Sequence, residues 1–188
     1  MALITIREII DLIIMTILLG YIFMSYIKRP KTVYDLTHGS GFDFEDFKFA
    51  IIVTAPAVIV HELAHKFVAL SFGLSATFKA WFFGLFLGVL LKLFNSPIII
   101  IAPGFVQISE GGSNLIYALI SFAGPAVNLL LFLISSYVLN HKKRLTRTQA
   151  VVWYLTKQIN LFLFIFNMLP IPPLDGSKVY YNLFKAIF

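Results

Sequence analysis

Four apolar runs of membrane-spanning length limit what this chain can fold into. They cover residues 9–27, 47–72, 115–139 and 150–169, and a helix of about 20 apolar residues crosses the hydrocarbon core of a bilayer. Only 13% of the 188 residues are charged, about half the fraction of a typical soluble domain. The sequence therefore predicts one membrane-embedded domain, residues 1–188, in a multi-pass protein of the cell membrane.

Residues 78–108 do not form a clean span. Their first half is short and contains Lys92, and their second half is broken by Pro97, Pro103 and Gly104. Non-helical backbone persists in lipid only where protein or a water-filled cavity satisfies its polar groups. We therefore expect a re-entrant or β-hairpin element here, with a single transmembrane helix as the alternative.

Two basic clusters, at residues 28–31 and 142–147, give an argument about topology. The positive-inside rule places both clusters on the same side of the membrane, which requires residues 78–108 to cross it an even number of times. The predicted fold class is thus an all-α polytopic membrane protein, with five or six membrane helices and a re-entrant or β-hairpin element at residues 78–108.

The net charge of +6 does not indicate nucleic-acid binding, because the basic clusters flank apolar runs. Lysine and arginine in such positions contact the headgroups of the lipid bilayer. The chain has no cysteine, which excludes disulfides and thiolate ligands. A bound metal would have to be held by histidine, carboxylate and water.

The apolar run 47–72 carries the sequence HELAH, in which His61 and His65 flank Glu62. On a helix, residues i and i+4 lie on one face about one turn apart, so both imidazoles can bind one ion. Glu62 lies beside that face, where it can act as general base toward a zinc-activated water. Ionisable groups inside an apolar span are costly, on the order of a few kcal/mol each. This cost favours metal ligation over packed, uncharged histidines.

Catalytic zinc uses three protein ligands and keeps one open position, so a third ligand must come from elsewhere. Asp175 follows the last long apolar run, behind a proline cluster that ends the helix and frees backbone carbonyls. Its alternative role is a helix cap or turn residue. The remaining candidates fall in loops at the membrane edge: His38, His141, Asp35, Asp43, Glu45 and Asp46.

Three motifs resemble, in order, those of the site-2 protease family of intramembrane zinc metalloproteases. They are HELAH at 61–65, GPAVN at 124–128 and NMLPIPPLDG at 167–176. The resemblance covers most of the chain and implies that Asp175 is the third zinc ligand. It also implies that Asn128 and Asn167 lie near the metal, where they bind substrate backbone or an oxyanion. Interhelical hydrogen bonding is the alternative role for both asparagines.

The resemblance further implies a membrane-associated β-element at the position of residues 78–108. A chain of 188 residues leaves no room for a regulatory PDZ or CBS domain, so we expect a compact catalytic core regulated by membrane partners or by access. Orientation departs from the family pattern. The family's histidine helix usually runs toward the cytosol, whereas the positive-inside rule would run this one outward.

The sequence thus predicts a zinc metalloendopeptidase with one Zn²⁺ per chain. It would cleave transmembrane or membrane-proximal segments of membrane proteins, with Glu62 as general base. The alternative is a catalytically silent or non-proteolytic zinc protein that binds membrane partners, and such a relative is expected to lose Glu62 or a ligand. A hydrolase of other substrates is a further alternative. A metal transporter is disfavoured, because the ionisable groups gather at one site.

Overall fold

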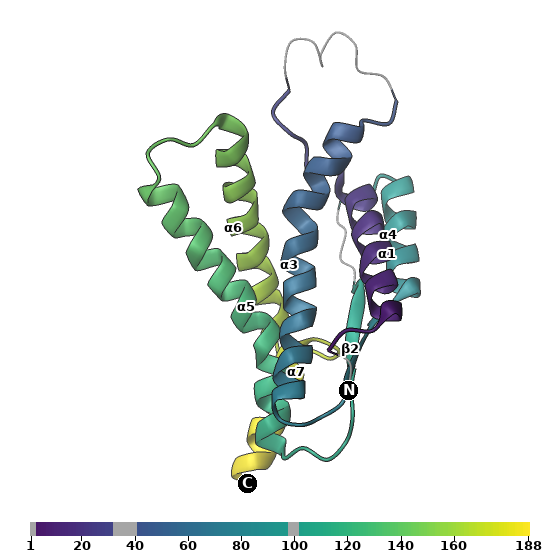
Figure 1. The fold of residues 1–188 in the computed structure, drawn as a ribbon, viewed down its shortest axis with the longest axis vertical. Coiled ribbons are helices and arrows are strands. Elements are labelled where there is room, and N and C mark those ends of the chain that lie inside the picture. Colours follow the sequence, from purple (N-terminus) through teal and green to yellow (C-terminus); the bar gives the residue numbers. More distant parts are fainter. Residues whose placement is uncertain (1–2, 32–40, 98–101) are drawn as a thin grey trace.

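The computed structural model describes residues 3–31, 41–97 and 102–188, which are mostly helical (Figure 1). The elements, in chain order, are α1 (Ile6–Phe23), α3 (Phe44–Ser71), β1 (Ala76–Ala80), α4 (Phe82–Leu93), β2 (Gly104–Ile108), α5 (Asn114–His141), α6 (Arg147–Asn167) and α7 (Asp175–Ile187).

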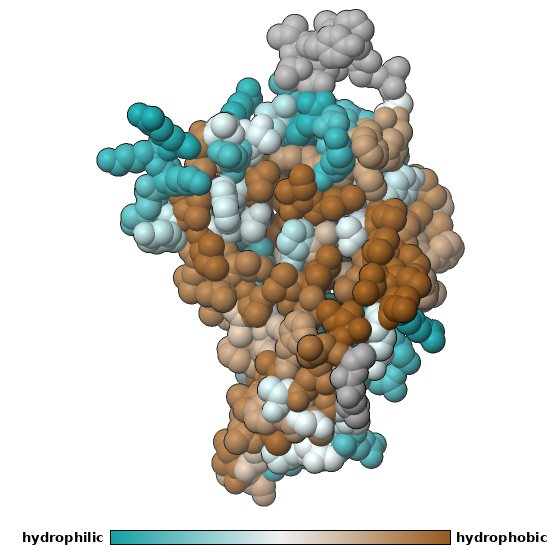
Figure 2. All heavy atoms as spheres, in the orientation of Figure 1, coloured by the Kyte–Doolittle hydropathy of each residue, from teal (hydrophilic) through white to brown (hydrophobic). Residues whose placement is uncertain are grey.

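Three of the described helices, α3, α5 and α6, are long and apolar enough to cross a membrane. Helix α3 runs through the centre, with α5 and α6 on one side and α1 and α4 on the other (Figure 1). Hydrophobic side chains gather over the middle of the molecule, and hydrophilic ones at the end that holds the α5–α6 loop (Figure 2). The predicted helical membrane character is confirmed, whereas a total of five or six spans stays a prediction.

Capping residues in the sequence explain where several helices begin. Asp43 accepts hydrogen bonds from two backbone N–H groups at the start of α3, and Ser113 caps α5. Thr146 and Gln149 form a capping box at the start of α6. These side chains satisfy N–H groups that have no partner within the helix.

The region predicted as a re-entrant or β-hairpin element contains a two-stranded antiparallel sheet. Strands β1 and β2 pair with Phe78 opposite Val106, and helix α4 is inserted between them. A single transmembrane helix here is wrong, and so is an all-α fold in the strict sense. Helix α3 ends and α5 begins at the same end of the molecule (Figure 1), as the charge argument requires. The position of the sheet and α4 in a bilayer stays a prediction.

Helix α1 is joined to α3 and to β1 through buried carboxylates. Glu8 accepts hydrogen bonds from the Lys66 ammonium and, at 2.7 Å, from the backbone N–H of Phe78. Asp11 accepts one from the backbone N–H of Ala80 at 3.2 Å. Glu8 and Lys66 are each 1% exposed, so neither charge is compensated by water. The charges that interrupt the apolar pattern of α1 therefore fix the sheet against the helix that carries the HELAH motif.

This arrangement predicts that Lys66→Met will unfold the protein more easily, because it leaves Glu8 buried without its counter-charge. We expect a loss of about 3–5 kcal/mol in the free energy of unfolding, the usual cost of breaking a buried pair, measured by denaturant titration in detergent. The control is Lys48→Met, which breaks the exposed pair of Lys48 with Glu45 and should cost no more than about 1 kcal/mol. Equal losses in the two variants would contradict the role given to the buried pair.

Candidate metal centre

The two histidines of the HELAH motif point to one side of α3 and converge at their Nε2 atoms. The two Nε2 atoms lie 3.2 Å apart, with the ring planes nearly perpendicular at 83°. This follows from the i, i+4 spacing on a continuous helix, which places both side chains on one face. Both histidines are buried among α3, α5 and α7.

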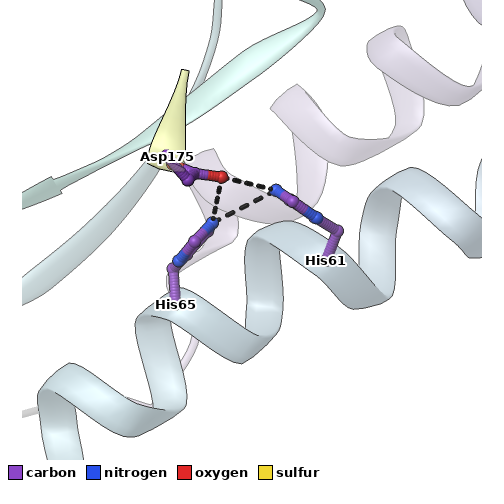
Figure 3. A group of neighbouring side chains, drawn as sticks. All are labelled: His61, His65 and Asp175. Carbon is purple, nitrogen blue, oxygen red and sulfur yellow. Dashed lines mark hydrogen bonds and ion pairs between the residues drawn. The ribbon is translucent and has the colours of Figure 1, made fainter. Parts of the chain in front are cut away.

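Asp175 completes a group of three donor atoms (Figure 3). Its Oδ2 lies 3.1 Å from Nε2 of His61 and 3.2 Å from Nε2 of His65. Leu174 is the N-cap of α7, and no side-chain cap bond forms there. The carboxylate of Asp175 faces the two histidines. Asp175 is not the N-cap residue of α7.

The donor set and its spacing fit zinc. Two imidazole nitrogens and one carboxylate oxygen are a common ligand set of catalytic zinc. Ligands about 2.0–2.1 Å from a tetrahedral ion lie roughly 3.3 Å from one another, close to the distances between the three atoms here. Ligation would also relieve the close approach of two imidazole nitrogens that both carry lone pairs.

Glu62 follows His61 directly and lines the same cavity as the three donor atoms. This cavity has a volume of about 810 Å³ and is bounded by α3, α6, strand β2 and the segment that leads into α7. Glu62 is buried but borders the cavity rather than forming part of the donor triangle. A carboxylate in that place can exchange a proton with a molecule in the cavity.

Gly124 of α5 makes the close approach of α5 to the site possible. A Cβ atom built at this position would lie 2.7 Å from Nε2 of His61 and closer still to Nε2 of His65. Any larger residue would occupy the space beside the Nε2 atoms of both histidines. The GPAVN motif thus contributes room for an ion in addition to its asparagine.

The two asparagines of the resemblance occupy different places. Asn128 is fully buried and its Oδ1 lies 2.5 Å from Nδ1 of His61, on the far side of the ring from the donor atoms. Asn167 lines the same cavity as Glu62. Sequence reasoning did not single out Asn160, which contacts Asn128, although a polar residue inside an apolar helix was a usable signal.

The other candidate ligands of the sequence are not brought to the site. Asp43 and Asp46 bind the Lys31 ammonium at 2.6 and 2.7 Å, and this contact lowers the pKa of Asp43. Glu45 pairs with Lys48, and His141 lies exposed at the end of α5. His38 and Asp35 lie outside the described residues.

Comparisons with known proteins find relatives that are named as zinc metalloproteases. A family model described as "Peptidase family M50" matches residues 140–188. "Putative zinc metalloprotease MJ0611" of Methanocaldococcus jannaschii is 35% identical over 183 residues, which cover 92% of this chain and 83% of that protein. "Putative zinc metalloprotease YwhC" of Bacillus subtilis is 32% identical over 150 residues, or 70% of this chain and 67% of that protein. No solved structure gives a significant match.

The chain belongs to peptidase family M50, the site-2 protease family. The resemblance seen in its three motifs is thereby confirmed. Membership places the chain among zinc metalloproteases, the three apolar helices agree with a membrane protein, and the family implies zinc as the cofactor and a lipid environment for the substrate.

The closeness of Gly124 to both histidines predicts a specific defect in Gly124→Ala. The added methyl group should displace one imidazole and weaken zinc binding at least tenfold, by analogy with the roughly 10–100-fold losses seen when a metal ligand's support is disturbed. Zinc affinity is measured by competition with a chelator. Gly112→Ala is the matched control, because its Cβ would meet only side-chain atoms, 3.1 Å or more away. Unchanged zinc affinity in Gly124→Ala would show that the ion lies elsewhere.

Proposed function

We propose that this protein is an intramembrane endopeptidase that binds one zinc ion per chain through His61, His65 and Asp175, with Glu62 as general base. The observation that carries the proposal is the donor triangle, with sides of 3.1–3.2 Å, beside a carboxylate in a cavity large enough for a peptide segment. We further propose that residues 1–188 act as a single domain in a multi-pass protein of the cell membrane.

Zinc held by these residues would supply a Lewis acid that polarises the scissile carbonyl and acidifies water. Glu62 would take the proton of the attacking water and then return it to the leaving amine nitrogen. Its place next to His61 on α3 keeps it within reach of the same reacting atoms. Most of the cavity lining is apolar, and electrostatic interactions are stronger in apolar surroundings than in bulk water.

An extended substrate segment could pair with the outer edge of β2, which no described strand occupies. Phe78 donates its N–H to Glu8 and not to β2, so Phe78 and Val106 are a pair without ladder hydrogen bonds. The N–H and C=O of Val106 therefore point away from β1. Val106 and Gly104 line the cavity together with His61 and Glu62. A transmembrane substrate unwound near its cleavage site could pair with this edge by strand addition.

The two asparagines receive separate roles in the proposal. Asn167 lines the cavity and would contact the substrate backbone or the developing oxyanion. Asn128 is turned away from the cavity toward Nδ1 of His61 and would orient that ligand. The membrane proteins cleaved, and any regulatory membrane partner, would reach the cavity from the bilayer.

One pair of variants distinguishes an active protease from the alternative, a catalytically silent zinc protein that binds membrane partners. Glu62→Gln should abolish cleavage of single-span substrates and keep one zinc per chain, because it removes the base and leaves the ligands. Asp175→Ala should lose both cleavage and metal. Zinc content and cleavage are measured on the same purified samples. A wild-type protein that binds zinc and cleaves no member of a broad substrate panel would favour the silent relative.

The open edge of β2 predicts a defect in substrate binding. Val106→Pro removes an outward N–H and leaves the β1–β2 ladder intact, so we expect KM to rise roughly three- to tenfold, the value of one net hydrogen bond, with little change in kcat. Phe105→Pro is the control, because residue 105 faces β1 and its substitution should lower the melting temperature instead. An unaltered KM in Val106→Pro would rule out pairing at this position.

A further inference from the structure

Three buried polar side chains, those of Asn160, Asn128 and His61, form a series of hydrogen bonds from α6 to the metal centre. Asn160 of α6 accepts a hydrogen bond at Oδ1 from Nδ2 of Asn128, at 2.8 Å. Asn128 of α5 in turn presents Oδ1 to Nδ1 of His61, at 2.5 Å. Both asparagines are 0% exposed, so water does not replace any of these contacts.

Backbone carbonyls fix the orientation of both amides. The Nδ2 of Asn128 donates to the carbonyl of Ala57 at 3.2 Å, and the Nδ2 of Asn160 donates to the carbonyl of Thr156 at 2.7 Å. A carbonyl only accepts, so rotating either amide by 180° would set two oxygens against each other. Asn160 is therefore held with its Oδ1 toward Asn128, and Asn128 with its Oδ1 toward His61.

The fixed amides decide which nitrogen of His61 carries the proton. Oδ1 of Asn128 only accepts, so Nδ1 of His61 must carry a proton, and the neutral imidazole then keeps the lone pair of Nε2 for an ion. Nε2 is the atom that faces Asp175 and His65. For His65 the same result is reached directly, because its Nδ1 donates to the backbone carbonyl of Ile120 at 2.7 Å.

We propose that Asn160 is a positioning residue of the metal centre, which holds Asn128 and thereby keeps His61 in the tautomer that binds zinc through Nε2. The inference rests on the proposed function in one respect, that His61 is a zinc ligand. His65 is held by main chain, which side-chain substitution does not remove. His61 is held only by side chains, and its orientation therefore depends on a residue two contacts away, on α6.

The size of the effect follows from the chain of contacts. Loss of a hydrogen-bond partner of a metal-bound histidine typically weakens metal binding by about 10–100-fold, so we expect Asn128→Leu to fall in that range. Asn160→Leu leaves Asn128 with its bond to Ala57, and we expect a smaller loss, roughly three- to tenfold. Because Asn160 acts through Asn128, the double variant should bind zinc no more weakly than Asn128→Leu alone.

The test measures zinc affinity of the full chain in detergent, by chelator competition, for both single variants and the double variant. Ser135→Ala is the matched control, since Ser135 is a fully buried polar residue of α5 that bonds only to Leu131 of its own helix among the described contacts, and its zinc affinity should be unchanged. Equal effects of Asn160→Leu in the presence and absence of Asn128 would overturn the relay. So would a wild-type affinity in Asn160→Leu.

A second measurement keeps the inference independent of folding and of zinc. Asn160→Gln keeps an amide that can accept from Asn128 and donate to a backbone carbonyl, and it should hold zinc affinity within about threefold of wild type, even if the leucine variant is unstable. In metal-free Asp175→Ala protein labelled with ¹⁵N-histidine, in which no carboxylate faces Nε2 of His61, NMR should show His61 protonated at Nδ1, and a mixture of tautomers once Asn160→Leu is added. A wild-type protein that binds no zinc would defeat the proposed function, whereas tautomers unaltered by Asn160→Leu would defeat the relay alone.

Discussion

The structure depends on one constraint: helix α3 is apolar and yet buries four polar side chains, those of His61, Glu62, His65 and Lys66. Three of them, the two histidines and Lys66, have hydrogen-bond or ion-pair partners on neighbouring elements. Each of three neighbouring helices supplies some of these partners. Helix α5 supplies acceptors for Nδ1 of both histidines, α7 supplies the carboxylate that faces both Nε2 atoms, and α1 supplies the counter-charge of Lys66. Unpaired, these groups would carry the desolvation cost of buried polar atoms.

This constraint explains why the site is built from distant parts of the chain. The HELAH histidines come from α3, whereas Asp175 and Asn167 lie within residues 140–188, the part that the M50 family model matches. Neither half forms a site alone. Helix α5 lies between them and approaches closely enough only because residue 124 is glycine. The relay from Asn160 extends the dependence to α6, so that α3, α5, α6 and α7 all contribute to one centre.

Much of the site could be predicted from the sequence, because its signals are local. The i, i+4 histidines need only a helix, and the proline cluster before Asp175 marks a break that frees a carboxylate. The partners of Lys66 and of Asn128 could not be predicted in the same way, since they depend on which helices meet and at what height. Glu8 directly precedes the apolar run 9–27 and Asp11 interrupts it, and nothing in the run itself indicates that both bind backbone N–H groups of β1. Periodicity also missed helix α4 between the strands, because hydropathy does not separate a short apolar helix from an apolar strand.

The outer edge of β1 is hydrogen-bonded to α1, whereas among the described contacts the outer edge of β2 is not, and this difference follows from the acidic side chains of α1. Backbone N–H groups on the outer edge of β1 are satisfied by Glu8 and Asp11, so that edge cannot pair with another strand. The N–H and C=O of Val106 on β2 point away from β1, and Val106 lines the cavity that holds His61 and Glu62. In lipid an unsatisfied strand edge is costly unless protein or water covers it. An extended peptide in the cavity would cover it, so the same charges that anchor the sheet to α3 leave its open edge on the side where cleavage is proposed to occur.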